Sequence, residues 1–221
     1  LHYPLRRQRQ MCIRDREVWG FIKKSTDQLE QKYYIAPDRR AVQKILNSLT
    51  SGELKSKMPG VYIAFKIVYC CGARIGEIKH LMWEQIKHES NGIWIYFGIN
   101  ESSSGTKNRK QRKVELPESL YNELCEMDLD EDYICGSDFH YRDRQLERDF
   151  SKWMRSTGWT RHQCAHEIRK LFGCNLAEHT NNLESVAKVL GHSNIKTTYN
   201  YYHDKINKVD TPDFNNKDLP S

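Results

Sequence analysis

The sequence has no apolar run long enough for a membrane-spanning helix. Its longest apolar stretch, VYIAFKIVYCCGA, begins at Val61, is interrupted by Lys66 and is shorter than the roughly 18–20 residues that such a helix requires. Residues 1–20 also lack the apolar segment of a secretory signal peptide. The sequence therefore predicts a cytoplasmic protein.

The cysteines show no pattern of disulfide bonds or metal ligands. There are seven, an odd number, and no two of them are spaced as CxxC. A disulfide framework or a common structural zinc site needs regular spacing, so we expect reduced thiols and no bound metal. A zinc module would have to use a set of residues whose spacings match no common zinc finger: Cys164, His166, Cys174 and His179.

The chain also contains no internal repeat and no low-complexity tract. Its 221 residues suffice for one large domain or for one domain with an ordered extension, and we expect a single domain. Apolar residues recur at helical spacing behind a predicted N-cap at Asp38 and in a buried central helix that ends at Gly72. A strand is predicted at 91–99, and KVEL before Pro117 is its return partner. The fold class is therefore mainly α (α+β), with a small antiparallel hairpin. Further segments with helical periodicity are 118–127, 141–157, 164–178, 183–190 and 194–203.

Positive charge is modest in sum and concentrated in two places. The chain has 35 Lys and Arg against 29 Asp and Glu, a net charge of +6, which is compatible with a polyanionic partner. One basic segment lies at the N-terminal end, with RRQRQ followed by Arg14 and Arg16. The other is the predicted hairpin loop, whose basic side chains are either solvated or bind such a partner: Lys107, Arg109, Lys110, Arg112 and Lys113.

Six residues have side chains that can hold or cleave a phosphodiester: Arg74, Lys107, His166, Arg169, His192 and Tyr201. His166 and Arg169 are one helical turn apart, so their side chains are neighbours on one helix face and can hold a phosphate oxygen together. Each motif alone also has an ordinary explanation. HxxR occurs on partly exposed helices, Arg74 and Glu77 can form a surface ion pair, and a basic hairpin tip discourages edge-to-edge strand pairing.

The order and spacing of these motifs resemble those of the tyrosine recombinase or phage integrase family. CGARIGEI, a hairpin carrying TKNRKQRKVELP, HEIRKLFG and the box VLGHSNIKTTYNYYH follow one another at matching intervals within residues 36–203. The resemblance implies the fold of the family's catalytic domain, a helical bundle with a small antiparallel sheet. It also implies a site-specific recombinase or integrase of a mobile element, which cleaves and rejoins DNA through a 3′-phosphotyrosine intermediate without a cofactor, in bacterial, archaeal or viral-host cytoplasm.

Three motifs of the family supply the groups that hold the phosphate. ARIGE supplies the first catalytic arginine as Arg74, with Glu77 as its acidic support, and HEIR supplies His166 and Arg169. LGHS supplies His192. Planar arginine forks and a histidine donor form hydrogen bonds that strengthen as negative charge develops on the non-bridging oxygens, so no metal is needed.

The remaining roles are those of nucleophile and general acid. The residue nine positions beyond the box histidine is Tyr201, whose phenol, with an ordinary pKa of roughly 10, needs help to lose its proton. His166 is the candidate acceptor for that proton. In the family, the hairpin lysine lies eight residues before the second residue of the return strand. Counted back from Glu115, the resemblance thus implies Lys107 as the residue that protonates the leaving 5′ oxygen, and Lys110 is the alternative.

Three tyrosines in TTYNYYH compete for the place of the nucleophile. At about 100° per residue, Tyr199, Tyr201 and Tyr202 point in different directions on a helix and cannot all face one phosphate. Tyr202 is the chief alternative to Tyr201. We expect Tyr199 and Tyr202 to pack against neighbouring helices.

The motifs divide the chain into three parts: an N-terminal extension or remnant of an upstream domain at 1–35, the catalytic domain at 36–203 and a polar tail at 204–221. Because the family usually carries an N-terminal DNA-clamping domain and this chain begins with Leu, we expect a fragment with reduced sequence specificity. We expect a monomer in solution and a tetramer on double-stranded DNA, with Val209 and Phe214 of the tail docking on a neighbouring subunit.

Three other interpretations stay open from the sequence. LESVAKVLGHSNIKTT, with Ala187 and Gly191 four residues apart, is also compatible with a non-catalytic helix-turn-helix. A type IB topoisomerase and a telomere resolvase would use the same tyrosine chemistry. The helix-turn-helix interpretation leaves Arg74, Lys107 and the HxxR spacing unexplained.

Overall fold

The fold is built around helix α4 (Pro59–Cys71), which is buried on nearly all sides in this computed structural model. The structure describes residues 34–98, 111–127 and 132–206, and those from Ile35 onward belong to one unit. Helix α4 starts with a proline, which is preorganised for the first turn, and ends at Gly72, which has the left-handed conformation at φ 59°. The predicted buried central helix and its glycine cap are therefore confirmed.

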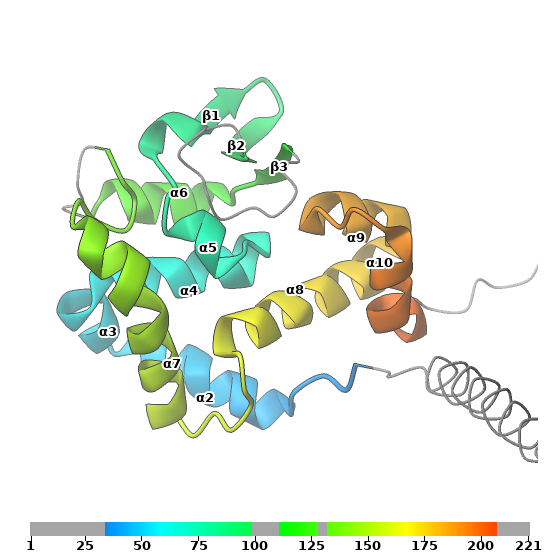
Figure 1. Cartoon of the computed structure of the whole chain (residues 1–221), viewed down its shortest axis with the longest axis horizontal. Coiled ribbons are helices and arrows are strands. Elements are labelled where there is room, and N and C mark those ends of the chain that lie inside the picture. The colour runs from blue at the N-terminus through cyan, green and yellow to red at the C-terminus, as the bar shows by residue number, and fades with distance from the viewer. Residues whose placement is uncertain (1–33, 99–110, 128–131, 207–221) are drawn as a thin grey trace, which may run out of the picture. The chain divides into compact units, whose positions relative to one another are not determined.

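Helices α3 (Glu53–Lys57), α5 (Ile75–Ile78), α7 (Leu146–Ser156) and α8 (Cys164–Thr180) pack directly against α4. Figure 1 shows α8 running past α4 toward α9 and α10. The predicted N-cap of α2 is confirmed, because the Asp38 side chain accepts a hydrogen bond from the Arg40 amide. A π-helical turn (Tyr141–Gln145) precedes α7. The helices are α2 (Arg39–Thr50), α3 (Glu53–Lys57), α5 (Ile75–Ile78), α6 (Glu118–Cys125), α7 (Leu146–Ser156), α8 (Cys164–Thr180), α9 (Leu183–Leu190) and α10 (Ile195–Tyr202).

An antiparallel sheet of three strands, β1 (Ile86–Glu89), β2 (Gly92–Phe97) and β3 (Arg112–Glu115), packs beside the helices in the order β1-β2-β3. In β2, Ile93, Ile95 and Phe97 enter the core, while the residues between them are only half-buried. The predicted pairing of β2 with β3 is confirmed. We did not predict β1, because its sequence IKHE is short and mostly polar, and it becomes a strand by pairing with β2.

The prediction of a mainly helical fold with a small antiparallel sheet is thus confirmed. In the ranges that the structure describes, no helix combines the length and the apolar character needed to cross a membrane. The division at residues 35 and 203 stays a prediction.

Candidate active site

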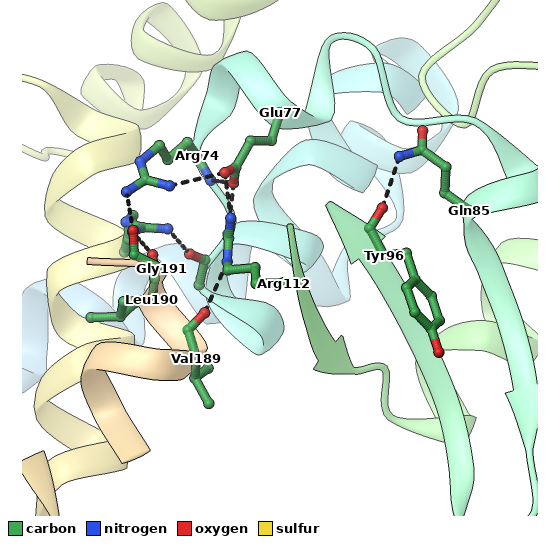
Figure 2. A network of polar contacts seen from close by, with 10 residues as sticks. Arg74, Glu77, Gln85, Tyr96, Arg112, Val189, Leu190 and Gly191 are labelled. Carbon is green, nitrogen blue, oxygen red and sulfur yellow. Dashed lines mark hydrogen bonds and ion pairs between the residues drawn. The ribbon is translucent and has the colours of Figure 1, made fainter. Parts of the chain in front are cut away.

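The C-terminal end of α9 is held by three arginines from three other parts of the fold. The carbonyl oxygens of residues 189–191 each accept a hydrogen bond from a different guanidinium (Figure 2). The donors are Arg112 of β3, Arg169 of α8 and Arg74 just before α5, and the bonds from Arg112 Nε and Arg74 Nη2 measure 2.9 and 3.2 Å. Because the last carbonyls of a helix lack intrahelical partners and carry partial negative charge, this end favours cations.

Arg169 lies at the centre of this arrangement. It is 3% exposed, and it donates to the carbonyl oxygens of Gly72, at the end of α4, and of Leu190. Burial, followed by the charges of Arg74 and Arg112, lowers the pKa of Arg169 to about 9. The guanidinium therefore stays positive at neutral pH, and it is fixed between the ends of two helices.

Arg74 shares one buried carboxylate with Arg112. Its backbone amide donates to Glu77 Oε2 at 2.7 Å and its Nη1 to Glu77 Oε1 at 2.9 Å. Burial alone would raise the pKa of Glu77, but hydrogen bonds and charge from Arg112, and then those from Arg74, hold it below its ordinary value. The Arg74 side chain is still 39% exposed, so this ionised pair leaves part of the guanidinium facing solvent.

His192 follows directly on the arginine-bound end of α9. Gly191 caps the helix with a φ of 64°, and the His192 amide donates back to the Ala187 carbonyl oxygen at 2.9 Å. The ring Nδ1 lies 2.7 Å from the Thr198 hydroxyl oxygen on α10. Burial and the surrounding arginines, Arg169 first, lower the pKa of His192 to about 4, so its ring is neutral at pH 7.

A pocket of about 300 Å³ brings three of the predicted residues together: Arg74, His166 and Arg169. The first turn of α8 supplies His166, which is exposed. Partial burial of its ring, and then the charges of Lys170 and Arg169, lower the pKa of His166. The pocket thus presents two cations and a histidine that favours its neutral form. His192 and Tyr201 are not among the residues that line it.

The three tyrosines of α10 point in different directions, as the helical spacing predicted. Tyr202 is 2% exposed and stacks on the His192 ring with 6.5 Å between ring centres. It also lies against Gly173, where an added Cβ would come within 2.6 Å of its ring. Tyr199 is 47% exposed and stacks on His203. The expected packing therefore holds for Tyr202 and not for Tyr199, which lies at the surface and stacks on a residue four positions along the chain.

Tyr201 is half-buried and lies beside a lysine that the motif analysis did not assign. Lys170 Nζ is 5.2 Å from the centre of the Tyr201 ring. The same ammonium group is 2.9 Å from Glu167 Oε1. Since Lys170 directly follows Arg169 on α8, this contact places Tyr201 next to the helix that carries the arginine.

The basic hairpin residues other than Arg112 fall into two groups. Lys107, Arg109 and Lys110 lie outside the described residues. Lys113 is on β3, where its Nζ is 2.6 Å from Glu89 Oε2 and 4.3 Å from the centre of the Trp94 ring. Their roles in DNA binding, like the catalytic roles of the other candidates, stay predictions.

Arg112 differs from what the sequence indicated. We grouped it with the basic side chains of the hairpin, which are either solvated or bind DNA, but its side chain is only 6% exposed. Its guanidinium is occupied by Glu77 and the Val189 carbonyl oxygen and lies over the Phe97 ring. The strand alternation contained the signal for this position, because Arg112 is two residues before the buried Val114 and shares its face.

The four residues considered for a zinc module lie entirely on α8, with the first and the last, Cys164 and His179, fifteen residues apart. A rise of about 1.5 Å per residue separates these side chains too widely for one ion. Within the described part of the chain, no group of three or more His, Cys, Asp or Glu is arranged to hold a metal.

Comparisons with known proteins agree with this geometry. Residues 38–208 match the sequence profile of the phage integrase family. A tyrosine recombinase of Pseudothermotoga lettingae is 28% identical over 180 residues, which are 76% of this chain and 58% of the relative.

Solved structures show the same fold. The catalytic domain of bacteriophage HP1 integrase superposes with a TM-score of 0.55 at 20% identity and covers 77% of this chain and 87% of that one. The XerH site-specific recombinase bound to its difH substrate gives 0.56 at 19% identity, covering 79% and 49%. The chain spans about half the length of the curated relatives it matches. Because the family profile covers most of the sequence, this chain belongs to the phage integrase family of tyrosine recombinases.

Proposed function

We propose that this chain carries the catalytic domain of a site-specific DNA recombinase or integrase that breaks and rejoins DNA through a 3′-phosphotyrosine intermediate. The observation that carries the proposal is the pocket that Arg74, His166 and Arg169 line together, next to the end of α9 that precedes His192. Two fixed guanidinium groups in one hollow match the charge and the planar oxygen pairs of a phosphodiester.

In this proposal the phosphate is held by charge-assisted hydrogen bonds. Arg74 and Arg169 bind the non-bridging oxygens, which gain negative charge as the phosphorus becomes five-coordinate. His192 is neutral and its Nδ1 is engaged with Thr198, so its hydrogen bond to the phosphate would come from Nε2. The Thr198 hydroxyl then donates to Nδ1 and fixes the tautomer.

The nucleophile in this proposal is the Tyr201 hydroxyl. Its oxygen forms a bond to phosphorus while the bond from phosphorus to the 5′ oxygen breaks, which leaves the 3′-phosphate on the tyrosine and a free 5′ hydroxyl. The phenol proton passes to His166, which is suited to accept it because its lowered pKa keeps it neutral. Attack by another 5′ hydroxyl reverses these steps, so rejoining needs no ATP.

A nicked suicide substrate tests the function directly. A short strand released beyond the scissile phosphate diffuses away, so rejoining is prevented and a covalent protein–DNA species accumulates on a denaturing gel. A non-catalytic helix-turn-helix protein would shift the DNA on a native gel and give no covalent species. Relaxation of a supercoiled plasmid or formation of hairpin ends, without strand exchange between two sites, would indicate a topoisomerase or a telomere resolvase.

We propose Lys107 as the general acid that protonates the leaving 5′ oxygen. Lys107→Ala should therefore cleave an ordinary substrate slowly and regain cleavage on a substrate with sulfur in place of that oxygen, because a thiolate leaves without a proton. Single-turnover cleavage of the two substrates gives the comparison. If Lys110→Ala shows the rescue and Lys107→Ala does not, the assignment of the hairpin lysine is wrong by three residues.

We also propose that the chain, a monomer in solution, acts on duplex DNA as a tetramer in which the tail after His203 docks on a neighbouring copy. The structurally similar XerH recombinase is bound to its difH substrate, and lambda integrase is a dimer on a core site, which supports assembly on DNA. Deletion of residues 204–221 should leave affinity for one duplex unchanged and reduce recombination between two sites. Full recombination by the shortened chain would contradict the exchange of tails.

A further inference from the structure

The Arg112 side chain is buried although it belongs to a run of basic residues. Each of its three guanidinium nitrogens has a protein acceptor: Nε donates to the Val189 carbonyl oxygen at 2.9 Å, Nη2 to Glu77 Oε2 at 2.7 Å, and Nη1 to Glu77 Oε1. The guanidinium carbon lies 4.5 Å from the centre of the Phe97 ring. With all three nitrogens engaged, this arginine is positioned for contacts within the protein and not for contact with a ligand.

Glu77 links Arg112 to Arg74. The one carboxylate is paired with both guanidinium groups, so the three side chains together carry one excess positive charge (Figure 2). Arg112 makes the fuller pairing, because its two Nη atoms bind the two carboxylate oxygens while Arg74 binds with one Nη and its backbone amide. Without Arg112, the Glu77 charge would fall entirely on Arg74 and oppose its attraction for an anion.

Arg112 also restricts the conformation of the backbone directly before His192. Its side chain lies against Gly191, where an added Cβ would come within 2.8 Å of Arg112 Cδ. It holds the carbonyl of Val189, the first of the three that are bound by arginines. Arg112 is therefore in contact with the supports of both Arg74 and His192.

We propose that Arg112 is a positioning residue for the cleavage reaction: it neutralises Glu77 and fixes the end of α9, so that Arg74 and His192 meet the scissile phosphate in one geometry. This inference rests on the proposed function. Arg112 itself touches neither the phosphate nor the nucleophile, and its effect passes through two residues that do.

The test uses Arg112→Met in single-turnover cleavage of the suicide substrate at saturating protein, with DNA affinity and the melting temperature measured in parallel. We expect cleavage to fall about 10- to 100-fold, the range typical of residues that orient a ligand-binding group, while affinity changes little. Cleavage at the parent rate would overturn the inference. A loss confined to affinity would also overturn it, since that result indicates direct contact with DNA.

A second substitution separates positioning from general stability. If Arg112 acts by neutralising Glu77, adding Glu77→Gln to Arg112→Met removes the uncompensated charge, and the double variant should cleave faster than Arg112→Met alone. A residue needed only for folding would give a double variant that is equally slow or slower, and this outcome would contradict the inference.

If Arg112→Met does not fold, the same cleavage test is made with Arg112→Lys. It keeps a cation beside Glu77 but loses the fork and the bond to Val189, so we expect the melting temperature to fall less than in Arg112→Met and cleavage by the folded protein to be about tenfold slower. Parent-like cleavage by this variant would refute the inference equally well. The matched control is Arg142→Lys, because Arg142 is another buried arginine that binds backbone carbonyls, those of Lys79 and Gly136, outside the pocket.

Cleavage by the parent protein shows whether a negative result refutes the proposed function or only the role of Arg112. If it forms no covalent species on the substrate, the proposed function is refuted and this inference with it. If parent and Arg112 variants form the species at equal rates, only the role of Arg112 is refuted.

Discussion

Tyr201→Phe is expected to form no covalent complex with DNA and to bind duplex DNA as the parent does. The substitution removes one hydroxyl from a half-buried side chain, and that hydroxyl oxygen is the atom proposed to bond to phosphorus. The loss should be complete within detection, because the remaining ring has no nucleophilic atom. A denaturing gel of the suicide substrate measures the complex, and a native gel measures binding.

Tyr202→Phe is the matched control. Tyr202 neighbours Tyr201 in the chain, but it is buried between the His192 ring and Gly173. We expect this variant to form the covalent complex, since its aromatic packing is kept and only a buried hydroxyl is lost. If Tyr202→Phe loses the complex and Tyr201→Phe keeps it, the nucleophile is the next residue along the chain.

Arg169→Lys should slow cleavage by at least about 100-fold, which corresponds to about 2.7 kcal/mol of transition-state stabilisation. A lysine has one ammonium group and cannot donate to Gly72, Leu190 and a phosphate oxygen in the fixed directions of a guanidinium. DNA affinity should change far less, because the charge is retained. Single-turnover cleavage over a range of protein concentrations separates the two effects.

The control for this prediction is again Arg142→Lys. Arg142 lies over the Tyr133 ring and holds two backbone carbonyls near the end of α5. Both lysine variants lose a buried fork, so both should lower the melting temperature, and only Arg169→Lys should lower the cleavage rate of the folded protein. Cleavage by Arg169→Lys within a few-fold of the parent would remove Arg169 from the phosphate site.

Local pattern accounts for most of the fold. The central helix is apolar around nearly its whole circumference and ends at a glycine, so both its burial and its end could be predicted before the structure. The helix N-cap at Asp38 and the pairing of β2 with β3 follow from equally local signals. Strand β1 could not be predicted in this way, because its four residues become a strand only through their partner.

Only part of the candidate site could be predicted from the sequence. Motif spacing identified Arg74, His166 and Arg169, and the structure brings them to one pocket. The strand alternation around Val114 is a local signal for the inward direction of Arg112, but it does not identify its acceptors, because Glu77 and Val189 are 35 and 77 residues away in the chain. Contacts of this kind depend on tertiary packing, which no short window of sequence contains.

The arginine-bound end of α9 has a consequence for how the site tolerates sequence change. The three guanidinium groups bind main-chain oxygens, which every amino acid supplies, so these hydrogen bonds do not depend on which side chains residues 189–191 carry. The choice of residue at position 190 is restricted by burial in the apolar core. At position 191 it is restricted by the left-handed backbone conformation and by the contact with Arg112. Substitutions that preserve the helix end therefore leave the electrostatic support of the histidine intact, whereas loss of one arginine removes a support that no side chain at 189–191 can replace.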